Sequence, residues 1–123
     1  MPNQVVVLVV EDEERVHQYL MKELLDSGFV QEVVVADRLS EAVSAFEKIK
    51  DTLGAVLMDA CLMDDCPDTL ELTRHIRANF GGVIVAMSRD PGYRQMQVVA
   101  GCNHQCSKYE AAGYLLKILT ANQ

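Results

Sequence analysis

The chain has 123 residues, the size of one ordinary domain and enough to bury a hydrophobic core. Hydrophobic residues make up 50% and charged residues 24% of it, which excludes an intrinsically disordered chain. The net charge of −7 and the lack of a Lys/Arg cluster in the sequence argue against direct binding to nucleic acid.

No targeting or membrane segment is visible. Apolar runs fall short of the roughly 18 residues that would indicate a membrane span. The segment Met1–Gln4 lacks the basic stretch of a signal peptide, and the apolar run that follows it is too short. We therefore expect one domain over residues 1–123, a cytoplasmic location and no membrane partner.

Short apolar, β-branched runs alternate with longer helical patterns. The run Val5–Val10 is continuous, as in a strand buried on both faces of a parallel sheet. Further strands are expected at 33–36, 55–58, 83–87 and, with a weaker pattern, 102–106.

Helical spacing and capping residues place a helix after each strand. Val16, Leu20 and Leu24 recur at helical spacing before Gly28, which ends the first helix. The second helix is expected to begin at the N-cap Asp37 and to place Ala42, Val43, Phe46 and Ile49 inward. The third is expected from Pro67, with Leu72, Ile76 and Phe80 inward. The last two helices are expected from Asp90-Pro91 to Gly101 and over 111–119.

Five such β–α units predict an α/β fold with an open, doubly wound parallel sheet and right-handed crossovers. We expect the flavodoxin-like strand order 2-1-3-4-5, with helices on both faces of the sheet. No linker or repeat divides the chain.

The residues that follow the predicted strands carry the chemistry. Glu11 and Asp12 follow the first strand and Asp59 the third; Ser88 follows the fourth and Lys108 the fifth. In an open α/β sheet the binding crevice lies at the carboxyl ends of the strands. Each residue alone has an ordinary role in a turn, at a helix N-terminus or on the surface, so the signal is their joint placement.

Three clustered acids repel one another unless a cation is present. A hard divalent ion with oxygen ligands relieves this repulsion, and Mg²⁺ suits a site with few carboxylates. A carboxylate nucleophile, Mg²⁺, a lysine and a hydroxyl together are what a transferring phosphoryl group needs.

The sequence resembles the receiver domains of response regulators over essentially its whole length. The segments that carry the resemblance are Val7-Leu8-Val9-Val10-Glu11-Asp12-Glu13, Leu57-Met58-Asp59, Ala86-Met87-Ser88 and Ala100-Gly101 through Ser107-Lys108. The resemblance implies a phosphoprotein of a two-component phosphorelay, a signal-transduction module and not an enzyme.

The resemblance also implies roles and partners. Asp59 would accept a phosphoryl group from a histidine kinase or a phosphotransfer protein, and a downstream effector protein or domain would read the signal. Ser88 and Lys108 would contact the phosphoryl oxygens. The implied ligands of the Mg²⁺ cofactor are Glu11, Asp12, Asp59 and the backbone carbonyl of Cys61.

Several positions depart from the family pattern. The loop 61–69 is longer than usual, and its Asp64, Asp65 and Asp68 are interpreted as acids that favour a helix N-terminus. Arg89 stands where the family has a small residue, and a side chain pointing to solvent is expected; the alternative is a guanidinium that screens the site or contacts a bound phosphate. Gln105 replaces the usual aromatic residue, and Tyr109 replaces a proline that commonly follows a cis peptide bond. A trans Lys108–Tyr109 bond is expected because cis bonds before non-proline residues are costly.

Two alternatives remain open at this point. A degenerate receiver would keep the fold and bind partners without being phosphorylated. A flavodoxin-like enzyme or nucleotide binder would share the architecture, although no GxGxxG or GxxxxGK[ST] motif follows the first strand.

The four cysteines, Cys61, Cys66, Cys102 and Cys106, form no CxxC pair, so we expect reduced thiols without zinc.

Overall fold

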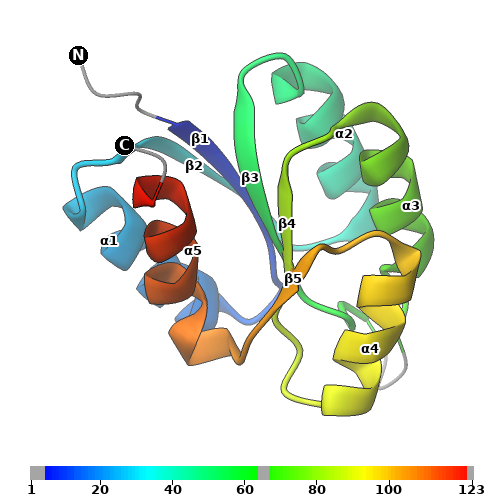
Figure 1. Cartoon of the computed structure of the whole chain (residues 1–123). Helices are drawn as coiled ribbons and strands as arrows, with labels where there is room; N and C mark the ends of the chain where they lie inside the picture. The colour runs from blue at the N-terminus through cyan, green and yellow to red at the C-terminus, as the bar shows by residue number, and fades with distance from the viewer. Residues whose placement is uncertain (1–4, 64–66, 122–123) are drawn as a thin grey trace.

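The structure is a computed structural model, and it describes residues 5–63 and 67–121. Strands and helices alternate along the chain (Figure 1). The strands are β1 (Val5–Val10), β2 (Val30–Ala36), β3 (Leu53–Met58), β4 (Val83–Ala86) and β5 (His104–Gln105). The helices are α1 (Glu14–Asp26), α2 (Leu39–Ile49), α3 (Leu70–Asn79), α4 (Pro91–Ala100), the short 3₁₀ helix η1 (Lys108–Glu110) and α5 (Ala111–Thr120).

The five strands form one parallel sheet in the order β2-β1-β3-β4-β5, so the predicted fold class and strand order are confirmed. Helices α1 and α5 cover one face of this sheet, and α2, α3 and α4 cover the other (Figure 1). Each face has its own hydrophobic core, one packed around Leu20 and Leu115 and the other around Phe46 and Ile76.

Most predicted helix ends agree with the structure. Asp90 is the N-cap of α4, where its carboxylate accepts hydrogen bonds from the backbone N–H groups of Gly92 and Tyr93. Gly101 ends α4 with a φ of 145°, in a region that side chains rarely adopt. A Cβ added to Gly101 would lie only 2.8 Å from the Cβ of Arg77, so a close approach to α3 also requires glycine here.

Two predicted helix starts are wrong. Helix α2 begins at Leu39 with Arg38 as its N-cap, one residue after the expected Asp37. Helix α3 begins at Leu70 with Thr69 as its N-cap, so Pro67 lies before the helix and not in its first turn. The inward role expected for Val43 is wrong as well, because that side chain is 40% exposed while Ala42 and Phe46 are buried.

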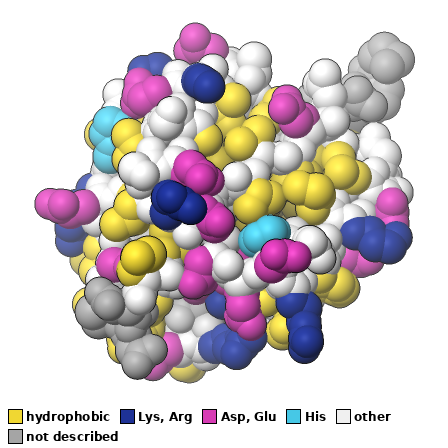
Figure 2. Space-filling view, turned by 180° about the vertical axis from the view of Figure 1, so that it is seen from behind, with side chains coloured by type: hydrophobic (Ala, Val, Ile, Leu, Met, Phe, Trp, Pro, Cys, Tyr) yellow, Lys and Arg dark blue, Asp and Glu magenta, His cyan; other side chains and the backbone are white. Residues whose placement is uncertain are grey.

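Within the described residues, no helix is long and apolar enough to cross a membrane. On the face of the molecule shown in Figure 2, Lys and Arg side chains are scattered among Asp and Glu side chains and do not gather in one patch. This distribution agrees with the lack of a Lys/Arg cluster along the sequence.

Candidate functional site

The pairing of the strands brings the predicted site residues to one edge of the sheet. Val10 at the end of β1 pairs with Met58 at the end of β3, and Met58 pairs with Ala86 at the end of β4. Because the three strands end in register, the residues that follow them meet at the same carboxyl edge. Glu11 and Asp59 are the next residues after β1 and β3.

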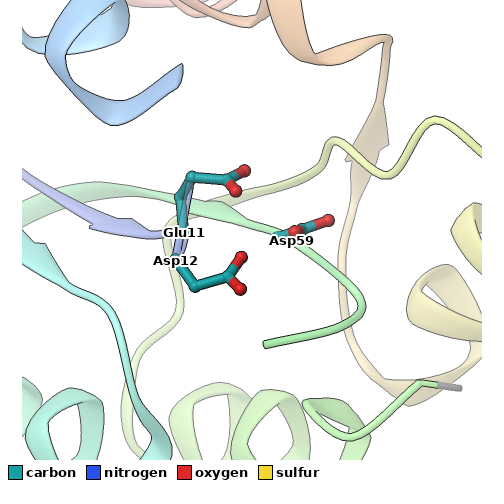
Figure 3. A group of neighbouring side chains, drawn as sticks. All are labelled: Glu11, Asp12 and Asp59. Atoms are coloured by element: carbon teal, nitrogen blue, oxygen red, sulfur yellow. The ribbon is translucent and has the colours of Figure 1, made fainter. Parts of the chain in front are cut away.

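Three carboxylates lie together at this edge. One oxygen from each of Glu11, Asp12 and Asp59 lies within 4.8 Å of the others. The side chains leave the ends of β1 and β3 beside one another, as Figure 3 shows. Glu11 and Asp59 are buried, whereas Asp12 is exposed at the mouth of the site. The acidic cluster expected from the sequence is therefore present.

Lys108 reaches the same place from the 3₁₀ helix η1. Its Nζ lies 3.0 Å from Oδ2 of Asp59 and 3.0 Å from Oε1 of Glu11, and only 8% of the side chain is exposed. The described residues contain no cis peptide bond, so the trans Lys108–Tyr109 bond is confirmed. A trans bond thus still places the ammonium between the two buried carboxylates.

Burial and mutual repulsion change the acidity of the buried acids. Burial, together with the nearby charge of Asp59, raises the pKa of Glu11 to about 7, although Lys108 opposes the rise. Burial also raises the pKa of Asp59 above its usual value, again against the effect of Lys108. For Lys108, burial would lower the pKa, but Asp59 and Glu11 outweigh it and keep the ammonium charged.

These shifts predict a pH dependence for the metal-free protein. Glu11 has a pKa of about 7 in the folded chain and 4.5 as a free group, so the folded state holds more protons between these values. Its contribution to the free energy of unfolding should therefore decrease as the pH rises from about 4.5 to about 7. The slope cannot exceed about 1.4 kcal/mol per pH unit for one proton.

Urea denaturation in the presence of EDTA, repeated across this pH range, measures the slope. The matched variant is Glu11→Gln, which removes the titrating group while keeping its size. The difference in stability between wild type and variant should change with pH in the stated direction. If the two proteins show parallel pH profiles, the raised pKa of Glu11 is wrong.

The donor set fits a hard divalent cation. Oε1 of the buried Glu11 accepts no hydrogen bond within the described part of the chain, although Lys108 lies near it. An additional carboxylate from Asp12 is open to solvent at the mouth. Oxygen donors of this kind, next to water, suit Mg²⁺ or Ca²⁺. Glu11, Asp12 and Asp59 are thus the residues that could hold a metal ion.

An open cavity of about 420 Å³ lies over the cluster. Its lining includes Asp12, Asp59, Cys61, Ser88 and Lys108, so the predicted hydroxyl and ammonium face the same space as the acids. A phosphoryl group on Asp59 would therefore lie in a space that already holds a hydroxyl and an ammonium. Cys61 lines this cavity too, and a ligand role for its backbone carbonyl stays a prediction.

Ser88 is held by its surroundings on two sides. Its hydroxyl accepts a hydrogen bond from the backbone N–H of Asp90 at 3.1 Å. Its backbone carbonyl accepts one from Nη1 of Arg94 at 2.7 Å. This contact of Arg94 was not predicted. The sequence indicates it only through the position of Arg94 about one helical turn after the start of α4, near Ser88.

Arg89 lies at the rim of the cavity, and 62% of its side chain is exposed. The expected exposure is therefore confirmed, but the guanidinium also has partners. It lies 3.3 Å from Oε1 of Glu13 and 6.0 Å from the centre of the Tyr109 ring. Arg89 thus lies at the rim while contacting Glu13, which directly precedes α1, and Tyr109 of η1.

Two residues whose roles the sequence did not reveal form hydrogen bonds to the described part of the loop after Asp59. The carboxylate of Asp68 accepts hydrogen bonds from the backbone N–H groups of Leu62 and Met63, at 2.8 and 2.9 Å. The buried hydroxyl of Thr69 lies 2.7 Å from the carbonyl oxygen of Asp59 and donates to it. Asp68 directly precedes Thr69, the N-cap of α3, as the interpretation of a helix N-terminal acid requires, but its carboxylate binds N–H groups of the loop. Asp64 and Asp65 lie outside the described residues.

The cysteines show no metal-binding arrangement within the described residues, where the one cluster of possible ligands is the acidic one. Cys102 and Cys106 are free thiols. Burial raises the pKa of Cys102 to about 12 and that of Cys106 to about 11, which makes both weak nucleophiles at neutral pH. Cys66 lies outside the described residues.

No model of a protein family matches the chain, and no curated protein sequence does. Solved structures, by contrast, match over nearly its full length. A response regulator receiver protein from Pseudomonas putida is 23% identical, with a TM-score of 0.74 and 100% of both chains covered. A two-component response regulator from Clostridium difficile is 18% identical, with a TM-score of 0.77 and 98% of this chain and 100% of the other covered.

A third structure was determined with ligands. It is a response regulator protein from Burkholderia pseudomallei with a phosphorylated aspartic acid, a calcium ion and citrate. It is 20% identical, with a TM-score of 0.78, and the match covers 97% of this chain and 68% of that chain. These similarities show that the chain has the fold of response-regulator receiver domains.

Proposed function

We propose that this chain is the receiver domain of a two-component phosphorelay and that it accepts a phosphoryl group on Asp59 with the help of Mg²⁺. The observation that carries the proposal is the site itself. A buried aspartate lies 3.0 Å from a buried lysine ammonium, beside two further acids and under an open cavity. A structural salt bridge alone would not need the additional acids or the open space.

The chemistry is a transfer between two nucleophiles. A carboxylate oxygen of Asp59 attacks the phosphorus of a phosphohistidine; a P–O bond forms, the P–N bond breaks, and the imidazole leaves and takes up a proton. The product is an acyl phosphate on Asp59. Lys108 and the hydroxyl of Ser88 offer positive charge and a hydrogen bond to the phosphoryl oxygens.

In this proposal Glu11, Asp12, Asp59 and the carbonyl of Cys61 hold Mg²⁺. When bound, the ion supplies charge neutralisation for the carboxylates and for the incoming phosphoryl group. The presence of a phosphorylated aspartic acid and a calcium ion in the Burkholderia pseudomallei response regulator supports both parts of the proposal.

The partners follow from this role. We infer a histidine kinase or a phosphotransfer protein as donor and an effector protein or domain as receiver of the signal, in the cytoplasm. Direct binding to nucleic acid is not part of the proposal, because the chain carries a net charge of −7 and lacks a Lys/Arg cluster.

A degenerate receiver is the second candidate. It is favoured by Gln105, which is exposed on β5 where the family has an aromatic residue, and by the ion-paired Arg89 at the rim. Such a protein would bind partners through the same fold without a change at Asp59.

Intact mass spectrometry after incubation with acetyl phosphate separates the two candidates. With Mg²⁺ we expect the addition of one phosphoryl group, because Asp59 is the acid that lies against Lys108 under the open cavity. With EDTA in place of Mg²⁺ the addition should be absent. A folded protein that takes up nothing under either condition would favour the degenerate receiver.

A further inference from the structure

Helix α4 places one polar side chain in the interior of the protein. Gln97 is completely buried, and its Nε2 donates a hydrogen bond of 2.8 Å to the backbone carbonyl of Met58. Met58 is the last residue of β3 and directly precedes Asp59. The side chain therefore connects α4 to the strand end that carries the proposed phosphoacceptor.

The fold does not need this hydrogen bond. The carbonyl of Met58 already accepts a sheet hydrogen bond from the backbone N–H of Met87 at 3.0 Å. Oε1 of Gln97 is buried and accepts no hydrogen bond from any residue that the structure describes. A buried polar atom without a partner costs about 1–3 kcal/mol. A methionine of similar size would avoid that cost but would lose the hydrogen bond to Met58, so the amide gives the fold little net stability.

The backbone of Asp59 is held on its other side as well. The hydroxyl of Thr69 donates to the carbonyl of Asp59, and the N–H of Asp59 donates to the carbonyl of Val10 at 3.0 Å. Consecutive carbonyls, those of Met58 and Asp59, are thus bound by buried side chains from α4 and from the start of α3. Polar groups that are costly for the fold and aimed at a site usually serve that site.

We propose that Gln97 is a positioning residue that fixes Asp59 against α4, so that a change at Asp59 is transmitted to this helix. The inference rests on the proposed function, because it concerns the same site. By reciprocity, whatever restrains α4 also shifts the equilibrium between the free and the modified form of Asp59. The outer side of α4 carries Met96 and Val99, whose side chains are 45% and 79% exposed, so a change in α4 reaches an apolar surface.

The Gln97→Met variant tests the proposal, with Gln95→Met as its matched control. Gln95 lies on the exposed side of the same helix. We expect Gln97→Met to unfold at the same or a higher urea concentration than wild type. We also expect it to take up the phosphoryl group from acetyl phosphate about tenfold more slowly, because a small displacement of a reacting group is costly. The control should match wild type in both respects.

Hydrogen exchange provides a readout that does not depend on turnover. With Mg²⁺ and beryllofluoride, a phosphoryl mimic, backbone amides of residues 91–100 should change their protection in wild type and in Gln95→Met. The change should be lost in Gln97→Met. Equal exchange changes and equal uptake rates in all three proteins would overturn the proposal.

The remaining outcomes are also decisive. If both Gln97→Met and Gln97→Leu are much less stable than wild type, the amide is structural and the inference is wrong. If wild type itself neither takes up a phosphoryl group nor responds to Mg²⁺ with beryllofluoride, the proposed function is wrong and the inference falls with it. A responsive wild type with a normal Gln97→Met variant would overturn the inference alone.

Discussion

Asp59→Asn should abolish phosphoryl uptake completely. The amide keeps the size of the carboxylate, but its neutral oxygen is not an effective nucleophile, and the other buried acid, Glu11, follows a different strand. The substituted side chain still lies near Lys108, which keeps Glu11 as a partner at 3.0 Å. The variant should therefore fold, and its failure to react would be chemical.

Intact mass spectrometry with acetyl phosphate and Mg²⁺ gives the result directly. The control is Asp51→Asn, which changes an exposed aspartate beyond the end of α2 and should react like wild type. The metal-free Asp59→Asn protein should also lose part of the rise in the pKa of Glu11, since the charge of Asp59 contributes to it. An unchanged adduct in Asp59→Asn would mean that another residue accepts the phosphoryl group.

The sheet and the edge on which the site lies could be predicted because they depend on local patterns. Strands such as Val5–Val10 are apolar throughout, which indicates burial on both faces and hence a parallel sheet. Once the strand order is given, Glu11, Asp59 and Ser88 must meet, since their strands end in register. The site residues then follow from their positions after the strands.

Features set by tertiary contacts could not be predicted. Pro67 suggested a helix start, but α3 begins only at Leu70, because Asp68 and Thr69 form hydrogen bonds with the segment that follows β3. Gln97 is a polar residue on the inner side of α4, and only the structure shows that it meets the carbonyl of Met58. Gln97 lies three residues before the buried Ala100, which indicates that both face the interior of the protein. This spacing does not identify the group that the amide contacts.

Lys108→Met should have the largest effect on stability. The substitution leaves the buried carboxylates of Glu11 and Asp59 without the ammonium that lies 3.0 Å from both. Breaking a buried ion pair by removing one partner typically costs about 3–5 kcal/mol. Because Lys108 lowers the pKa of Glu11, its removal raises that pKa further, and Glu11 in the variant is ionised only well above pH 7. We expect the full loss in the metal-free protein at such alkaline pH, and a smaller loss as the pH falls and Glu11 takes up a proton.

Urea denaturation with EDTA measures this loss, and Lys22→Met is the matched control. The Lys22–Asp26 pair is on the surface, with 72% of the lysine side chain exposed, so its removal should leave stability nearly unchanged. Mg²⁺ should restore more stability to Lys108→Met than it adds to wild type, because a cation then replaces the missing positive charge between the carboxylates. If Lys108→Met is as stable as Lys22→Met well above pH 7, where Glu11 is ionised in both proteins, the ammonium does not hold the acidic cluster together, and the charge balance at the site is wrong.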